Sequence, residues 1–222
     1  MKIVAAKKIL KANDQLASEN RDQFSAAGVF VINLVGSPGC GKTTLLEGLF
    51  PRLGKDLKPA VIEGDIAGQV DAERMEKIKV PVVQINTEGM CHLDANMIAA
   101  SVGGLELDAV RTLWIENVGN LVCTAGYDLG EHLRLVVLSI AEGDDKIIKY
   151  PAIFQRSDAL IITKNDLLPH CQFDLQRARQ DMQRLAPDAA IFAVSALDGA
   201  GLDRLAKWLV DRVNMPNARN GA

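Results

Sequence analysis

The sequence has no apolar run long enough to place the protein in a membrane. Hydrophobic residues make up 48% of the 222 residues, yet no segment approaches the roughly 18 consecutive apolar residues of a membrane span. Residues 1–20 mix charged and apolar side chains and lack the continuous apolar core of a secretion signal. We therefore expect a cytoplasmic protein without membrane contacts.

A surplus of basic residues is also missing. The chain has 25 Lys and Arg against 28 Asp and Glu, a formal net charge of −3. Nucleic-acid binding relies on a clustered basic face, so we expect no nucleic-acid partner. Cysteines are few, and in a reducing cytoplasm metal-binding or catalytic roles are commoner for them than disulfides. The four cysteines are Cys40, Cys91, Cys123 and Cys171.

Short apolar runs alternate with amphipathic segments along most of the chain. We expect strands at residues 29–35, 60–63, 81–86, 112–116, 133–140, 159–163 and 190–194. We expect helices at about residues 1–25 and at residues 42–50, 69–78, 93–102, 173–185 and 201–213. Several runs are apolar on both faces, as in strands that helices cover on two sides. The alternation predicts an α/β fold with a doubly wound, mostly parallel sheet.

A glycine-rich segment after the first predicted strand fits the phosphate-binding pattern G-x-x-x-x-G-K-[ST]. It consists of Gly36, Ser37, Pro38, Gly39, Cys40, Gly41, Lys42 and Thr43, and Thr44 continues into the predicted helix. Such a loop lets backbone N–H groups converge on phosphates. Lys42 is expected to contact the β and γ phosphates and Thr43 to bind Mg²⁺, while Cys40 serves through its backbone. The order of strand, loop and helix argues against a chance glycine-rich turn.

Magnesium at such a loop needs a second protein oxygen, usually from an acid at a strand end. Asp65 and Glu116 each stand at the carboxyl end of a predicted strand, the edge where open α/β sheets bind ligands. With Lys42 and Thr43 they form the predicted catalytic set. Gly119 stands where many GTPases carry the glycine of D-x-x-G, and its N–H is expected to face the γ-phosphate. The alternative for each acid is a solvated loop carboxylate.

A second motif follows the apolar run at residues 159–162. Its residues, Thr163, Lys164, Asn165 and Asp166, resemble the [NT]KxD guanine signature of GTPases. One carboxylate can accept hydrogen bonds from both N1–H and N2–H₂ of guanine, a pair that adenine lacks. We therefore expect Asp166 to select GTP over ATP and the Lys164 stem to cover the base. The element that resembles SA[KL], which faces guanine O6, consists of Ser195, Ala196 and Leu197.

Thiol and imidazole side chains stand close to these motifs in the sequence. Cys91, His92 and Cys123 offer ligands that suit Zn²⁺ and Ni²⁺, and three ligands per chain indicate an open site or one that a partner subunit completes. The alternative is that both cysteines are small buried hydrophobes and that His92 caps a helix. The residues alone leave both interpretations open. His132 and His170 are expected at the surface, Trp114 and Trp208 in the core, and Cys171 in a structural role.

The motifs belong to a larger set of specific segments: NLVGSPGCGKTTLLE, VIEGDIAGQVDAERME, INTEGMCHLDANMI, ENVGNLVC, AGYDLGEH, AEGDDKIIKYP and TKNDLLP. Through them the chain resembles the nickel-incorporation GTPases of hydrogenase maturation over about residues 9–213. The resemblance implies a single P-loop GTPase domain over residues 1–214, with a frayed tail at 215–222. It also implies a GTP-dependent metallochaperone that helps deliver Ni²⁺ to the large subunit of [NiFe]-hydrogenase and pairs with a zinc-containing accessory protein. By the resemblance, Cys91, His92 and Cys123 correspond to the family's metal site. That site would lie at the interface of a GTP-promoted homodimer.

Two departures from the family pattern stand out. No cysteine cluster or histidine-rich tract precedes Cys40, and Thr124 follows Cys123 where the family leads us to expect proline, which predicts a looser loop. Slow hydrolysis is also expected, because Asn120 stands where Ras-type enzymes place a water-orienting glutamine. By the resemblance, Lys146 or Lys149 reaches nucleotide across the dimer, whereas composition alone favours a solvated charged turn.

Three other functions remain open on the sequence. In the same fold, the chain could be a GTPase that serves urease or a cobalamin enzyme, which the segments GMCHLDA and ENVGNLVC argue against. It could instead be a GTP-controlled interaction switch whose cysteines and histidine are structural. The third alternative is an ATP-using kinase of similar fold, which nucleotide competition at Asp166 would distinguish.

Overall fold

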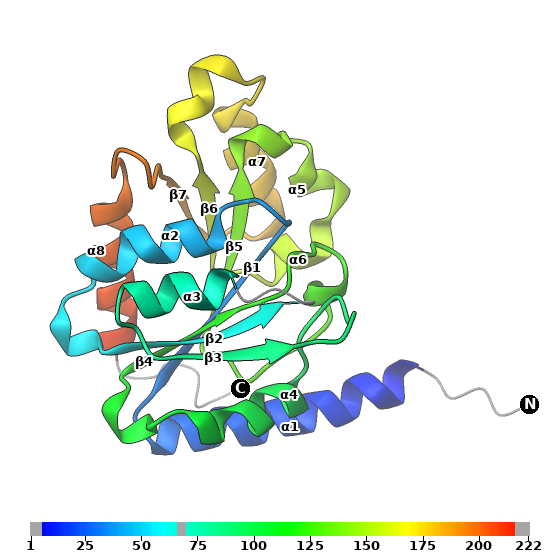
Figure 1. Cartoon of the computed structure of the whole chain (residues 1–222). Helices are drawn as coiled ribbons and strands as arrows, with labels where there is room; N and C mark the ends of the chain where they lie inside the picture. Colours follow the sequence, from blue (N-terminus) through cyan, green and yellow to red (C-terminus); the bar gives the residue numbers. More distant parts are fainter. Residues whose placement is uncertain (1–5, 66–69, 216–222) are drawn as a thin grey trace, which may run out of the picture.

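A sheet of seven parallel strands forms the middle of the molecule (Figure 1). The structure, a computed structural model, describes residues 6–65 and 70–215. The strands are β1 (Phe30–Gly36), β2 (Pro59–Asp65), β3 (Val82–Asn86), β4 (Thr112–Glu116), β5 (Leu133–Ser139), β6 (Ala159–Thr163) and β7 (Ala190–Ala193). Their order is β3-β2-β4-β1-β5-β6-β7, and every neighbouring pair in this sheet runs parallel. The predicted α/β fold with a parallel sheet is confirmed.

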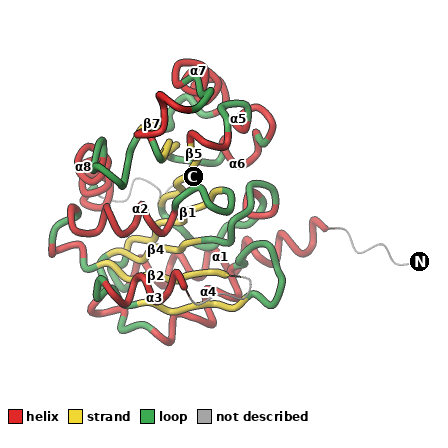
Figure 2. The backbone as a smooth tube through the Cα atoms, turned by 45° about the horizontal axis from the view of Figure 1, so that its top comes forward, coloured by secondary structure: helices red, strands yellow, loops and turns green. Residues whose placement is uncertain are grey.

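Helices cover both faces of this sheet (Figure 2). The α-helices are α1 (Ala6–Ala26), α2 (Lys42–Leu49), α3 (Val70–Lys77), α4 (Ala95–Ser101), α5 (Lys146–Lys149), α6 (Pro151–Gln155), α7 (Leu175–Leu185) and α8 (Leu202–Asn214). The 3₁₀ helices are η1 (Phe50–Arg52), η2 (Lys55–Leu57), η3 (Val102–Gly104), η4 (Leu107–Ala109), η5 (Cys123–Ala125), η6 (Ile140–Glu142) and η7 (Asn165–His170). Helices α2, α3 and α8 pack on one face, and α1, α4, α6 and α7 pack on the other. No helix in these two described ranges is long and apolar enough to cross a membrane.

Strand β1 shows why the central strands are apolar throughout. Ile32 and Leu34 point into the core cluster that α2 and α8 cover. Val31 points to the opposite face, into the cluster that contains Phe24 of α1. All three side chains are fully buried, because alternate residues of a strand point to opposite faces and helices cover both.

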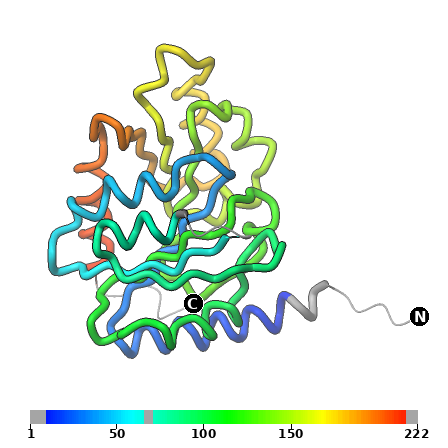
Figure 3. The backbone as a smooth tube through the Cα atoms, in the orientation of Figure 1, coloured from blue at the N-terminus to red at the C-terminus, as the bar shows by residue number. Residues whose placement is uncertain are grey.

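The N-terminal helix α1 lies beside α4, beneath one face of the sheet (Figure 3). Two asparagines of α1 fix this contact. Asn13 Oδ1 accepts a 2.9 Å hydrogen bond from the Ala95 N–H, and Asn20 Nδ2 donates a 2.8 Å bond to the Ala95 carbonyl. Because both asparagines are buried, these bonds satisfy groups that would otherwise be costly to bury.

The predicted elements match the structure closely, with differences at their ends. The predicted helix over 93–102 begins at Ala95, because the Asp94 side chain caps it by accepting a 2.8 Å hydrogen bond from the Met97 N–H. Asp174 caps α7 in the same way, so that helix begins at Leu175 rather than at residue 173. Residue 69, where we expect α3 to begin, lies outside the described residues, as do 1–5 and 216–222 of the predicted N-terminal helix and tail.

Some predictions about single elements and residues were wrong. The short helices α5 and α6 and the 3₁₀ helix η7 fall where no helix was predicted, because none is long enough to show a helical period in sequence. His132 is buried instead of exposed: its Nδ1 accepts a 2.9 Å hydrogen bond from the Val31 N–H, and its ring stacks on Phe30. Trp114 is buried, as expected, and Trp208 packs against the edge of the same core cluster.

Candidate functional site

A pocket of about 460 Å³ opens at the carboxyl ends of the central strands. The phosphate loop after β1, the end of β2 and the segment after β4 form its walls. The lining includes Lys42, Thr43, Thr44, Asp65, Glu116, Gly119 and Lys164, all of which we expected at a nucleotide site. The tertiary structure thus brings most of the predicted phosphate and magnesium residues together.

The phosphate loop has the backbone that its glycines predict. Gly39 and Gly41 adopt positive φ values of 72° and 93°, a region that other residues enter at a cost. A Cβ on Gly36 would lie only 2.5 Å from the Val137 carbonyl oxygen, so the strand leaves no room for a side chain there. Cys40 is fully buried beneath the loop, and burial raises the pKa of its thiol to about 11. Lys42 is held across the loop, with Nζ 3.4 Å from the Ser37 carbonyl oxygen.

Two buried glutamates form the acidic wall of the pocket. Thr43 Oγ1 donates a 2.8 Å hydrogen bond to Glu116 Oε1, while Glu116 Oε2 is buried and accepts none from the described residues. Glu63 lies in register with Glu116 on the neighbouring strand, and its Oε2 is likewise buried and unpartnered within the described chain. Burial raises the pKa of Glu116 to about 7, and burial together with the Glu116 charge raises that of Glu63 to about 8.

These orphaned carboxylate oxygens fit a divalent cation, since Mg²⁺ prefers oxygen ligands and would compensate the buried charge. Asp65 lines the same pocket and is partly exposed. Glu63 ends the strand expected over residues 60–63, yet it was missed because Asp65 was taken as the acid of that strand end; β2 extends to Asp65, which places Glu63 inside the strand. Its spacing of two from Asp65 was the available signal, since residues i and i+2 of a strand share a face.

Arg74 is a second residue of this pocket that sequence reasoning missed. It projects from α3 and donates hydrogen bonds of 2.9 Å to Glu47 of α2, 2.8 Å to Thr44 Oγ1 and 3.2 Å to Asp71. Two carboxylates and a hydroxyl therefore accept hydrogen bonds from its guanidinium. Arg74 ties α3 to the helix that follows the phosphate loop.

The guanine motif lies against the phosphate loop although the two are far apart in sequence. Lys164 Nζ donates a 2.8 Å hydrogen bond to the Gly39 carbonyl, and Thr163 Oγ1 donates a 2.6 Å bond to that of Cys40. The Asn165 N–H donates to the Val194 carbonyl at 3.0 Å, which joins this motif to the Ser195–Leu197 segment. Asp166, Ser195, Ala196 and Leu197 stand at these neighbouring strand ends without lining the pocket itself.

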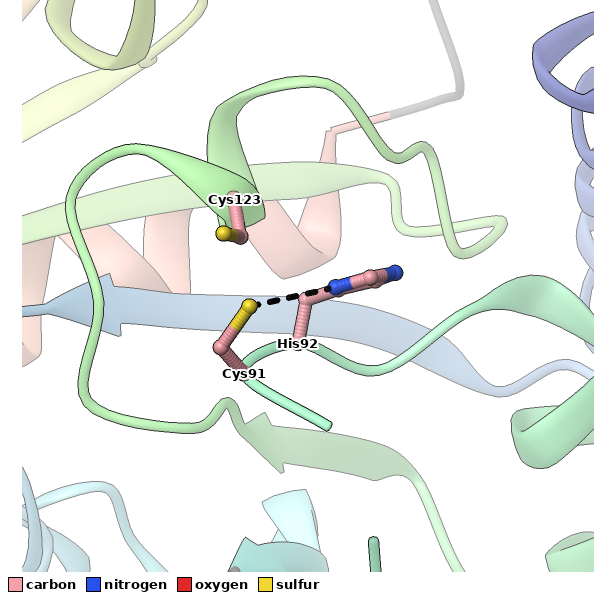
Figure 4. A group of neighbouring side chains, drawn as sticks. All are labelled: Cys91, His92 and Cys123. Carbon is pink, nitrogen blue, oxygen red and sulfur yellow. Dashed lines mark hydrogen bonds between the residues drawn. The ribbon is translucent and has the colours of Figure 1, made fainter. Parts of the chain in front are cut away.

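The predicted soft ligands also come together. The ligand atoms of Cys91, His92 and Cys123 all lie within 4.8 Å of one another (Figure 4). All three residues are partly exposed, so an ion can reach them. Burial lowers the pKa of His92, which favours the neutral imidazole that binds metals. Cys171, in contrast, packs against a core cluster on α7 and β6.

The loop that carries Cys123 is well fixed. His92 stacks on Tyr127 with ring centroids 3.9 Å apart. The Asn120 side chain accepts a 2.9 Å hydrogen bond from the Cys123 N–H. Thr124 is fully buried, and its hydroxyl donates to the Asn120 carbonyl. The Thr124 hydroxyl thus adds a hydrogen bond at the position where proline would restrict the backbone, and the looser loop stays a prediction.

Asn117 connects this cluster to the pocket. Its Oδ1 accepts hydrogen bonds from the Leu93 N–H at 3.2 Å and from its neighbour Val118 at 2.9 Å. Leu93 directly follows His92, and Asn117 directly follows Glu116. One buried side chain therefore joins the segment with two of the soft ligands to the segment with the pocket carboxylate.

Comparisons with known proteins agree with this geometry. The family model for the CobW/HypB/UreG nucleotide-binding domain matches residues 29–193. The hydrogenase maturation factor HypB of Azotobacter chroococcum mcd 1 is 46% identical over 201 residues, which is 90% of this chain and 66% of that protein. The chain thus spans about two thirds of that relative's length. A probable HypB of Methanocaldococcus jannaschii is 42% identical over 204 residues, which is 92% of this chain and 92% of that protein.

Two solved structures share the fold. HypB from Helicobacter pylori in complex with nickel superposes with a TM-score of 0.87 at 41% identity, covering 91% of this chain and 95% of that one. HypB from Archaeoglobus fulgidus gives a TM-score of 0.85 at 33% identity, covering 92% of this chain and 100% of the other.

Proposed function

Because the chain belongs to the HypB family of hydrogenase maturation factors, we propose that it is a GTP-hydrolysing metallochaperone that assists nickel insertion into [NiFe]-hydrogenase. One observation carries the proposal. The soft-ligand cluster of Cys91, His92 and Cys123 is joined through Asn117 to the carboxylate wall of a phosphate-binding pocket. A relative of known structure was solved with nickel, and nickel is here the cargo of the cluster.

In this proposal the phosphate loop and Lys42 bind the phosphates, and Thr43, Glu116 and Asp65 hold Mg²⁺. Glu63 lies beside Glu116 and adds a fourth oxygen donor to the same wall. When bound, Mg²⁺ neutralises charge on the phosphates. Asp166 accepts the paired N–H groups of guanine, and the segment Ser195, Ala196 and Leu197 borders the base, with the Leu197 side chain exposed beside it.

Intrinsic hydrolysis is proposed to be slow. The Asn120 side-chain oxygen accepts hydrogen bonds from the Val122 and Cys123 N–H groups, so it serves the loop and is not free to orient water. Arg74, the arginine that lines the pocket, is engaged by Glu47 and Asp71. GTPases in which no glutamine-like side chain orients the water and no arginine reaches the transferred phosphate hydrolyse GTP at about 10⁻⁴–10⁻² s⁻¹, and neither Asn120 nor Arg74 is free for these roles.

The proposed coupling runs through the segment after β4. Nucleotide and Mg²⁺ order such segments in GTPases, and hydrolysis releases them. Movement of Glu116 and Asn117 would change the hydrogen bond to Leu93 and so shift His92 relative to Cys123. Metal sites tolerate only about 0.2 Å of error in ligand distance, so a small shift would loosen the bound nickel.

A GTP-promoted homodimer is the proposed active assembly. Two apolar side chains beside the cluster are exposed, Met90 by 43% and Val122 by 64%, and a second copy would cover them. Three ligands per chain leave coordination for the partner to complete. Lys146 or Lys149 is the proposed contact to the partner's nucleotide, and Lys149 pairs with Asp145 in the single chain. The further proposed partners are a zinc-containing accessory protein and the hydrogenase large subunit, in the cytoplasm.

Equilibrium dialysis of Ni²⁺ and Zn²⁺ tests the metal site directly. Cys123→Ser should abolish binding by the cluster, whereas Cys171→Ser, a matched change elsewhere, should leave it intact. Equal metal binding by both variants would contradict the proposal and favour an interaction switch with structural cysteines. Hydrogenase activity in a strain without this protein, with and without excess nickel, then tests the target, because a urease or cobalamin-enzyme chaperone would leave hydrogenase unaffected.

A further inference from the structure

The molecule has a second, larger cavity that the proposed function does not use. It measures about 660 Å³ and lies at the amino ends of β2, β3 and β4, the opposite edge of the sheet from the nucleotide pocket. In Figure 1 this is the end of β2 and β3 away from their arrowheads. We call it the basal groove. Its floor is apolar and includes Phe50, Val80 and Val110, with Ile78 exposed by 37% at its edge.

The walls of the basal groove are fixed in position. Three of its lining residues are prolines, Pro51, Pro59 and Pro81, whose rings restrict the backbone. The Lys58 carbonyl accepts a 3.1 Å hydrogen bond from Arg111, and the Pro81 carbonyl accepts a 2.8 Å bond from Val61. A groove that is already formed loses little entropy when it binds a ligand.

Three lysines form the rim of the basal groove. Lys55, Lys58 and Lys79 are exposed, and within the described residues none of their ammonium groups forms a hydrogen bond or ion pair. Lys58 and Lys79 also have φ values of 34° and 59°, the left-handed region where glycine is favoured and other residues are strained. Backbone strain of this kind clusters at functional sites.

The charge of the groove indicates its occupant. Three lysines face a single acid of the lining, Glu106, although the whole chain is acidic with a net charge of −3. Residues 1–5, 66–69 and 216–222, which the structure does not describe, contain no acidic side chain that could pair with these lysines. Their only charged side chains are Lys2 and Arg219. The complementary ligand is therefore acidic and carries apolar side chains.

We propose that the basal groove binds an acidic segment of a partner protein, with apolar side chains seated on Phe50, Val80 and Val110 and carboxylates beside the three lysines. An apolar centre with a charged rim is the usual plan of a protein interface. The lysines steer an acidic partner to the groove, and the apolar floor retains it. Because the groove and the nucleotide pocket lie at opposite edges of the sheet, both can be occupied at once.

The test uses fluorescein-labelled peptides and the full chain, with binding measured by fluorescence anisotropy. One peptide is amphipathic and made of Leu and Glu, a second has Lys in place of Glu, and a third has Gly in place of Leu. The Leu and Glu peptide should bind best, and added salt should weaken it. Lys58→Gln with Lys79→Gln should weaken binding about threefold to tenfold, whereas Lys11→Gln with Lys207→Gln, which removes the same charge elsewhere, should not.

Ile78→Ser is a second variant, which removes apolar area at an exposed position. It should also weaken binding of the Leu and Glu peptide. Circular dichroism checks that each variant is folded. Equal binding by the two double variants would overturn the proposal, as would equal binding of all three peptides or displacement of the peptide by a GTP analogue. If Ile78→Ser abolishes a dimer that light scattering detects, and the groove binds no peptide, then the groove is an interface between two copies of this chain. That result would also overturn the proposal. Binding of the protein to phosphatidylserine vesicles but not to the peptide would also overturn the proposal.

Discussion

The Thr43 hydroxyl donates a 2.8 Å hydrogen bond to Glu116 Oε1 across the floor of the nucleotide pocket. This contact joins the helix after the phosphate loop to the end of β4. A divalent cation at the pocket would take its oxygens from these two residues, so the contact marks where we propose that Mg²⁺ binds.

Glu116→Gln should therefore reduce the dependence of GTP binding on Mg²⁺. The amide keeps the shape and can still accept from Thr43, but it lacks the charge that attracts the cation. We expect Mg²⁺ to bind at least about tenfold more weakly. GTP affinity measured with Mg²⁺ and with EDTA gives the readout, and Glu76→Gln on the exposed side of α3 is the control. An unchanged Mg²⁺ dependence would remove Glu116 from the site.

Asp166→Asn should weaken the binding of GTP and reduce the preference for GTP over ATP. Only guanine offers two adjacent donors to this carboxylate, and a site built on such bonds rejects an analogue without them by up to about 10⁴-fold. Competition of each nucleotide against a fluorescent GDP derivative measures the preference. Asp188→Asn changes an exposed aspartate before the amino end of β7, whereas the guanine motif follows the carboxyl end of β6, so this variant should change nothing. Similar affinity of the wild type for both nucleotides would refute the guanine site.

Glu63 should make the metal-free protein less stable as the pH rises. Its pKa is about 8 in the folded chain against an ordinary 4.5, so the folded state keeps a proton that the unfolded state loses between these values. Stability should fall over this interval, and Glu63→Gln should remove part of the fall, on the order of a few kcal/mol. Urea unfolding near both ends of the interval, with EDTA present, measures it. Parallel pH profiles for variant and wild type would contradict the burial argument.

Asn117→Ala should separate nickel binding from the nucleotide state. In the wild type we expect Ni²⁺ affinity to differ about tenfold between the GDP and GTP-analogue forms, and by linkage nickel should shift nucleotide affinity by the same factor. Without the Asn117 oxygen, the Leu93 N–H loses its partner and the difference should shrink while Cys91, His92 and Cys123 still bind. Titration of Ni²⁺ into both forms tests this, with thermal unfolding to check the fold. Identical affinities in the two wild-type forms would leave the coupling without support.

The cysteines should differ in their reaction with iodoacetamide. Burial raises the pKa of Cys40 to about 11 and removes it from solvent, so the folded protein should not be alkylated there. Bound Ni²⁺ should protect Cys91 and Cys123 but not Cys171. Mass spectrometry of digested protein reports each site separately. Alkylation of Cys40 without unfolding, or equal protection of Cys171, would be the contrary result.

Several parts of the site follow from the sequence because they are local. The phosphate loop depends on glycines at fixed spacing beside a strand and a helix, so its backbone can be predicted from residues 36–43 alone. The guanine motif and the alternation of strands and helices are predictable for the same reason. Helix starts were less accurate, since Asp94 and Asp174 act as caps only once their side chains turn back to the backbone.

The sequence by itself determined the parallel α/β fold, the phosphate loop and the guanine motif, because short stretches of contiguous residues encode them. Only the tertiary structure decided that Glu63 faces Glu116, that Asn117 bonds to Leu93 and that His132 is buried. These contacts depend on which strands are neighbours and on their register. No single strand carries that information, because packing of the whole sheet and its helices selects the order.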